Sequence, residues 1–256
     1  MRAILVSIIA FSVSGIAFAQ VTSQSDLAAR LSFGDPAVRR ESAMQLKSIP
    51  VAIREPIVLE ALVGELARIE QELGERRIAL DEGRQPPSVG EEAGEYLFAL
   101  LDVVADYNDP RALKSMLPFI GTGVRVMNAV ATFGESAVPD LVAMARSVDP
   151  RDDPTAAVEV LRRIVVLGNA EAPLSPQSTT AIVTLSQDLL RDSSSVAKLE
   201  AALHLAAATR DPALTTLVTE FASGIAAASR LGITDDRSKN SLRLAAQRAL
   251  AAVAAP

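Results

Sequence analysis

Apolar residues recur at intervals of three and four positions along most of the chain. This spacing places them on one face of an α-helix, whereas the alternation typical of half-buried strands is rare. Alanine and leucine, which are frequent in helices, dominate the pattern. The sequence therefore predicts an all-α protein.

Asp-Pro pairs punctuate this helical pattern. An Asp side chain accepts hydrogen bonds from the free N–H groups of a first helical turn, and Pro at the first helical position loses no hydrogen bond. Each pair is therefore predicted to begin a helix. The pairs are Asp35-Pro36, Asp109-Pro110, Asp149-Pro150, Asp153-Pro154 and Asp211-Pro212.

Paired helices are predicted between these marks. Val38-Arg39 with Ala43 returns as Val124-Arg125 with Ala129, and in part as Val196, Lys198 and Ala201. The spacing corresponds to units of about 40 residues, which is typical of paired-helix solenoids. About six pairs follow: 24–33 with 36–48, 50–82 with 88–107, 109–119 with 121–133, 135–148 with 153–168, 175–192 with 194–208, and 211–231 with 234–254.

Three stretches resemble HEAT repeats of the short type first described in phycobilisome lyases: GDPAVRRESAMQL, NDPRALKSMLPFI and FGESAVPDLVAMA. The resemblance is clear over residues 24–48 and 109–168 and weaker over 175–254. It implies a right-handed α-solenoid, here a single domain over residues 20–256. Because one partner cannot cover the apolar stripe of such a helix, neighbouring pairs must stack. Small residues at Ala43, Ala129 and Ala201 are expected to let adjacent helices approach closely.

The second pair departs from the repeat, because its first helix, VLEALVGELARIEQELGERRIALDEG, is far too long. An elongated helical hairpin is predicted at about residues 55–106. Residues 54–106 hold 13 acidic and 5 basic side chains, so much of the negative charge of the chain lies here. The hairpin is either a simple extension of the fold or an acidic arm that contacts a partner, with Glu70 and Glu75 as candidate contacts.

The first 19 residues have the three parts of a secretory signal peptide: Arg2, an apolar run, and small residues that end at Ala19. The run is shorter than the ~20 residues of a spanning helix, which favours cleavage after Ala19 over a retained anchor. Later segments lack an uninterrupted apolar stretch of 18 residues, so no stable membrane insertion is expected after cleavage. The prediction is a periplasmic or secreted bacterial protein.

Composition argues against several kinds of chemistry. The chain has no cysteine and a single histidine, His204, so a zinc or copper site would need carboxylates alone. The pairs Glu91-Glu92, Asp152-Asp153 and Asp235-Asp236 lack the spacing of a calcium loop. An acidic chain without a basic stripe also argues against nucleic acid. No cofactor, metal or catalytic residue is therefore predicted.

Basic residues recur on the second helices of the pairs. They form either a row that receives an acidic partner or an internal ladder with carboxylates of neighbouring turns. The internal ladder is favoured for Arg39 and Arg125, and the question is open for the others. The candidates are Arg39, Arg125, Arg162, Arg163, Arg243 and Arg248.

Aromatic residues cluster between residues 96 and 133. Core filling is the favoured interpretation, whereas exposed Tyr96 and Tyr107 would mark a contact with a partner. Together these features predict a non-catalytic protein–protein interaction scaffold in the bacterial cell envelope. The alternative, which follows from the lyase resemblance, is a protein that handles a small ligand or chromophore in its concave groove.

Overall fold

The computed structural model describes residues 23–85, 92–171, 173–223 and 235–254. Every regular element in these ranges is a helix, and they contain no strand, which confirms the all-α prediction. The predicted signal peptide, 1–19, lies outside the described residues. Within the described part, no helix combines the length and apolar character needed to cross a membrane.

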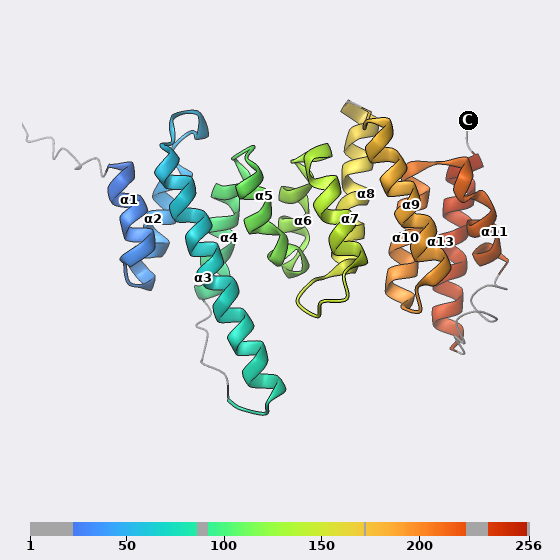
Figure 1. The fold of residues 1–256 in the computed structure, drawn as a ribbon, viewed down its shortest axis with the longest axis horizontal. Helices are drawn as coiled ribbons and strands as arrows, with labels where there is room; N and C mark the ends of the chain where they lie inside the picture. The colour runs from blue at the N-terminus through green and yellow to red at the C-terminus, as the bar shows by residue number, and fades with distance from the viewer. Residues whose placement is uncertain (1–22, 86–91, 172, 224–234, 255–256) are drawn as a thin grey trace, which may run out of the picture.

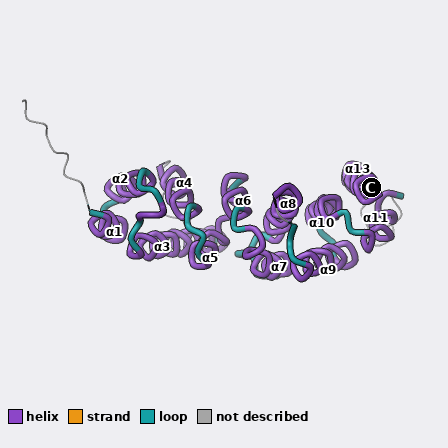
Figure 2. The backbone as a smooth tube through the Cα atoms, turned by 90° about the horizontal axis from the view of Figure 1, so that it is seen from above, coloured by secondary structure: helices purple, strands orange, loops and turns teal. Residues whose placement is uncertain are grey.

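The helices alternate between two rows (Figures 1 and 2). The first row contains α1 (Gln24–Phe33), α3 (Pro56–Asp81), α5 (Pro110–Met116), α7 (Val138–Arg146), α9 (Pro176–Asp192) and α11 (Thr215–Ala222). The second row contains α2 (Pro36–Lys47), α4 (Glu92–Ala105), α6 (Val124–Ala131), α8 (Pro154–Glu171), α10 (Val196–Thr209) and α13 (Asp236–Ala254). Short 3-10 helices are η1 (Val51–Ile53), η2 (Leu117–Thr122), η3 (Gly134–Ala137) and η4 (Pro212–Leu214). Most of the predicted helices match to within a few residues. The predicted 50–82 is divided into η1 and α3, and the predicted 211–231 is represented by η4 and α11, with 224–231 outside the described residues.

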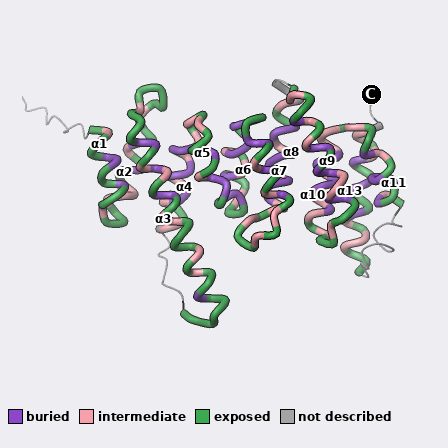
Figure 3. The backbone as a smooth tube through the Cα atoms, in the orientation of Figure 1, coloured by how far each residue is buried: buried purple, intermediate pink, exposed green. Residues whose placement is uncertain are grey.

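A single apolar core runs between the two rows, from Leu27 in α1 to Ala249 in α13. Figure 3 shows the buried segments where the rows face each other and exposed segments on the outer sides. Each helix contacts a partner in the other row and at least one neighbour in its own row, as α4 does with α3, α2 and α6. The amphipathic pattern of the sequence is therefore satisfied by stacking rather than by isolated pairs.

Asp-Pro pairs begin helices at four of the five predicted places. Asp35, Asp109, Asp153 and Asp211 each accept a backbone N–H of the following turn at 2.8–2.9 Å. The prediction is wrong at Asp149-Pro150, which lies in the loop between α7 and α8. Asp149 there accepts hydrogen bonds from the backbone and the guanidinium of Arg151. Asp109 forms the same bonds with Arg111 and does begin a helix, so they do not decide the outcome. Pro154 disfavours the helical conformation at Asp153, and α8 begins only after this residue.

The distal half of α3 leaves the body of the protein (Figure 1). Leu59, Leu62 and Leu66 are buried, but Leu73 and Leu80 on the same stripe are 37% and 57% exposed. The stripe continues past the point where neighbouring helices can cover it. We call residues 67–81 of α3 the arm. The elongated hairpin predicted at 55–106 therefore exists as α3 and α4, although residues 86–91 lie outside the described part.

The predicted small residues are not equivalent. Ala43 in α2 is fully buried and Ala201 in α10 nearly so, whereas Ala129 in α6 is only partly buried at the edge of the core. The shortness of α6 accounts for this difference, since Ala129 lies in its last turn, where the chain moves towards η3. The turn into η3 needs Gly134, whose φ of 58° lies in the left-handed region.

Replacing Ala43 by Leu is expected to lower the free energy of unfolding by about 1–3 kcal/mol, because extra carbon atoms must be forced into a filled space between helices. Thermal and urea denaturation of the purified protein measure this change. The control is Ala37→Leu, at an exposed position of the same helix, where a change within about 0.5 kcal/mol is expected. Equal stabilities for the two variants would show that Ala43 does not lie at a tight helix contact.

Candidate interaction surface

A buried carboxylate, Glu65, joins three helices at the base of the arm. Its side chain is 2% exposed and accepts hydrogen bonds from Arg68 at 2.7 and 2.8 Å and from the Tyr96 hydroxyl at 2.7 Å. Arg39 of α2 lies 3.4 Å away and also donates to the Gly34 carbonyl oxygen at 2.7 Å. A buried charge is tolerated only when it is paired and hydrogen-bonded, and Glu65 meets both conditions.

Two sequence candidates, Arg39 and Tyr96, thus have internal roles. Burial and the hydrogen bond to Glu65 raise the pKa of Tyr96, so its hydroxyl stays protonated and continues to donate. The sequence analysis did not single out Glu65. Its position three residues after Leu62 and one before Leu66 places it on the buried stripe of α3, and this signal could have identified it.

Tyr107 is held in a second internal cluster, around Arg54. The Arg54 side chain is 1% exposed and donates to the carbonyl oxygens of Ile49 and Val103 at 2.8 and 3.0 Å, and to Asp106 at 2.7 Å. Its guanidinium lies 5.4 Å from the centre of the Tyr107 ring. Both tyrosines are partly buried, so the structure favours core filling over an exposed contact.

Ion pairs also connect the second row across the surface. The Asp102 carboxylate of α4 accepts a hydrogen bond from Lys47 of α2 at 2.5 Å and also pairs with Arg125 of α6. Two turns earlier, Arg40 of α2 pairs with Glu95 of α4 at 2.8 Å. The internal ladder is therefore present at Arg125. This ladder uses the acidic residues of α4, whose negative charge is balanced by basic residues of the neighbouring helices α2 and α6.

Arg162 and Arg163 on α8 share the carboxylate of Glu159. Arg162 donates to it at 2.7 and 2.8 Å, and these bonds hold the pKa of Glu159 below its usual range. Arg163 lies 2.9 Å from the same carboxylate and also bonds to Asn128 of α6. Arg163 thus joins α6 to α8, whereas Arg162 is paired within α8, and Glu159 partly neutralises both charges.

Arg243 and Arg248 on α13 differ from the other basic candidates. Arg243 donates to the side-chain oxygen of Asn240 at 3.1 Å. Neither arginine forms an ion pair with a carboxylate among the described residues, and both are exposed. The whole of α13 carries four basic residues and one acidic residue. The last second-row helix therefore presents net positive charge to solvent.

Large apolar side chains accompany these charges on the second row. Figure 2 shows the rows following a shallow arc with the second row on its inner side. We call the exposed side chains of the second row the inner face. Its large apolar members are 44–59% exposed, and they lie on α2, α6, α8 and α13: Met44, Val124, Val166, Leu167 and Leu244.

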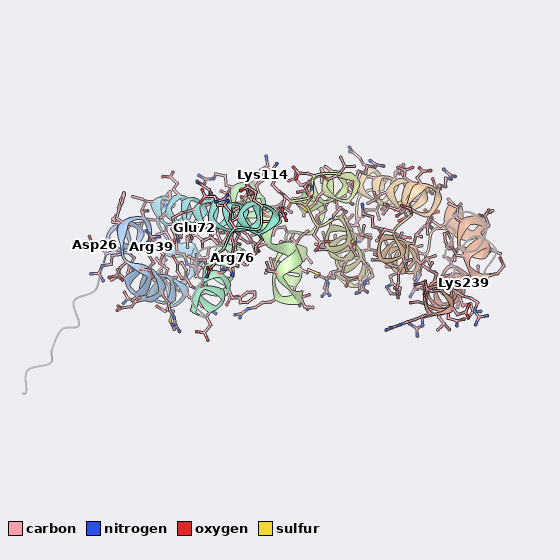
Figure 4. The ribbon with its side chains drawn as sticks, turned by 90° about the horizontal axis from the view of Figure 1, so that it is seen from below. Asp26, Arg39, Glu72, Arg76, Lys114 and Lys239 are labelled. Atoms are coloured by element: carbon pink, nitrogen blue, oxygen red, sulfur yellow. The ribbon has the colours of Figure 1, made fainter. Side chains whose placement is uncertain are left out.

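The acidic candidates Glu70 and Glu75 lie on the exposed arm. Glu75 accepts a hydrogen bond from Gln71 at 2.9 Å, and the neighbouring Glu72 pairs with Arg68. Figure 4 shows Glu72 and Arg76 on the arm, seen along its length from below. Since the arm also carries basic residues, the net negative charge of residues 54–106 is not concentrated on its tip.

A groove of about 410 Å³ lies between η3 and the end of α8. Its lining is half apolar, with Ile164, Leu167 and Leu174. At its edge Glu135 accepts hydrogen bonds from the hydroxyls of Ser175 and Ser178, which lower the pKa of this carboxyl. Elsewhere, the described residues contain no group of three or more His, Asp or Glu side chains that could hold a metal ion. His204 is partly buried in α10.

Comparison with protein-family models, curated proteins and solved structures gives no match. The resemblance to HEAT repeats therefore stays a prediction from the sequence.

Replacing Tyr96 by Phe is expected to lower the free energy of unfolding by about 1–3 kcal/mol, because a hydrogen bond to the buried charge of Glu65 is lost. Tyr107→Phe is the matched control, since the Tyr107 hydroxyl donates no hydrogen bond to a carboxylate among the described residues. That variant should be neutral or slightly more stable in chemical denaturation. A neutral Tyr96→Phe variant would contradict the role assigned to the Glu65 cluster.

Proposed function

We propose that the chain is a non-catalytic protein-binding scaffold of the HEAT-like solenoid type, which binds an extended acidic segment of a partner protein on its inner face. The unpaired arginines of α13 carry this proposal. Four of the candidate arginines pair with carboxylates within the fold, so their charges are balanced without an external ligand: Arg39, Arg125, Arg162 and Arg163. Arg243 and Arg248 are the candidates whose charges are left for a partner.

Apolar contacts would supply the rest of the binding energy. Met44, Val124, Val166 and Leu244 stand on separate second-row helices, and each is about half exposed or more. A segment that crosses the helices could cover these side chains in turn, while its carboxylates reach Arg243 and Arg248 on α13. Scattered exposed apolar residues are common on protein surfaces. The combination of such residues with unneutralised arginines on one row is what favours a binding face.

Peptide binding tests this proposal. A fluorescent peptide of alternating Glu and Leu is expected to bind the protein, with an affinity that falls as salt screens the charges. Arg243→Glu with Arg248→Glu should abolish binding without a change in melting temperature, because both residues are exposed. The control is Arg191→Glu, an exposed position on α9 in the first row, and should bind normally. Equal binding of a Lys-Leu peptide, or no loss in the double variant, would overturn the proposal.

The compartment proposed for this scaffold is the periplasm or the exterior of a bacterial cell, with the sequence of residues 1–19 as its support. Expression of the full chain in a bacterial host, followed by mass spectrometry of the intact protein, tests it. The expected product begins at Gln20 and is recovered from the periplasm or the medium. A cytoplasmic product that retains residues 1–19 would contradict export.

A second candidate function is the handling of a small ligand. The groove beside η3 favours it, because its volume of about 410 Å³ falls within the range of ligand pockets, ~300–1,000 Å³. Leu167 and Leu174 would contact an apolar ligand and Glu135 a cationic group. Arg243→Glu with Arg248→Glu should leave the binding of such a ligand unaffected, because neither arginine lines the groove, and this distinguishes the two functions.

A further inference from the structure

The first row of helices is interrupted in the middle of the molecule. In this row α3 packs against α5 and α7 packs against α9, but the contact between α5 and α7 is slight. The second row continues through the same region, where α4 packs against α6 and α6 against α8. Helices held together in only one of two rows can pivot about that row. The place where α5 meets α7 is therefore a joint at which the two halves of the array can bend.

The arm extends beyond the body and leans towards the loop between α7 and α8 (Figure 1). Arg77 on the arm donates a hydrogen bond from its Nη1 to the carbonyl oxygen of Pro150 at 2.8 Å. Pro150 lies in the loop between α7 and α8, so the contact skips the α5–α6 pair. A stretch of 15 helical residues is about 22 Å long, which exceeds the 8–10 Å between neighbouring packed helices. The unusual length of α3 is what allows it to reach this loop.

Charges on the two elements are complementary. Arg77 interacts electrostatically with Asp149, and Glu70 with Arg151. The loop presents these charges in a defined arrangement, because Asp149 accepts the Arg151 backbone N–H at 2.9 Å and its guanidinium at 2.6 Å. Those hydrogen bonds, with a smaller contribution from Arg77, lower the pKa of Asp149 to about 2. Asp149 therefore stays ionised at pH values well above 2.

We propose that the arm is an intramolecular strut, which bears on the loop at 147–153 and limits bending at the joint between α5 and α7. The excess length of α3 then has a mechanical role that the regular repeat does not supply. Glu70, a sequence candidate for partner contact, acts within the chain instead. The strut also affects the proposed binding face. Bending at the joint changes the distance from Met44 and Val124, on one side of it, to Leu244 and Arg248, on the other.

Distance measurements between spin labels test the strut. The natural chain has no cysteine, so Ala29→Cys on α1 and Thr184→Cys on α9 place two labels at exposed positions on either side of the joint. The labelled protein is expected to give a narrow distance distribution. Adding Arg77→Ala should broaden it and extend it to other distances, because the direct hydrogen bond across the joint is lost.

Arg84→Ala is the matched control, because Arg84 follows the arm and pairs with Glu82 rather than with the loop. It should leave the distribution unchanged. Melting temperatures of both variants should equal that of the labelled parent, since the substituted side chains are exposed. A second disruption, Asp149→Asn, should broaden the distribution as Arg77→Ala does.

An unchanged distribution in both Arg77→Ala and Asp149→Asn would overturn the strut, and so would equal broadening by Arg84→Ala. The measurement uses the free protein and no partner. Failure of peptide binding would therefore leave this result standing, and a failed strut would leave the binding face untouched.

Discussion

The structure depends on apolar stripes that no single neighbouring helix can cover. In a pair such as α7 and α8, neither helix can cover the whole apolar stripe of the other. Burial is completed only when the next pair stacks alongside. The core therefore runs unbroken from α1 to α13. The distribution of charge follows from this constraint. Charged side chains lie mainly on the solvent-facing sides of both rows, because the sides that face the core are taken up by apolar residues.

Charges are balanced both between helices of the second row and within single helices. The acidic residues of α4 lie between basic residues of α2 and α6, and the Asp102 carboxylate pairs with both neighbours. Within α8, Glu159 pairs with Arg162 and Arg163. Part of the acidic charge of residues 54–106 is thereby balanced in the fold. At α13, the last described helix, the arginines stay unpaired by acidic side chains in the part of the chain described. The charges available to a partner therefore depend on the neighbouring helices as well as on composition.

Much of the fold could be predicted because helix starts depend on contacts between residues close together in the sequence. Asp35-Pro36 and Asp153-Pro154 begin helices through contacts made within their own first turns, and such contacts are visible in sequence. Asp149-Pro150 has the same letters, and Asp149 forms the same hydrogen bonds with Arg151 as Asp109 forms with Arg111 at the start of α5. The difference lies in the second proline, because Pro154 disfavours the helical conformation at Asp153 and a helix begun at Pro150 could not continue. The Glu65 cluster was harder to foresee because its members come from α2, α3 and α4. Tyr96 and Arg39 could be recognised as unusual, but only the packing shows that they face inward to one carboxylate.

The arm, as the strut proposed above, stabilises the arrangement of the helix pairs on either side of the joint. In a stack where each pair contacts only its neighbours, small rotations at successive contacts add up, and the overall curvature is poorly determined. A contact that skips a pair removes this freedom locally, because the second and fourth pairs can no longer rotate independently. Arg77 and the loop carbonyl at Pro150 provide such a contact at the place where the first row is weakest. A face that binds an extended segment gains from this restraint, since its contacts are then held at a constant spacing before the segment arrives.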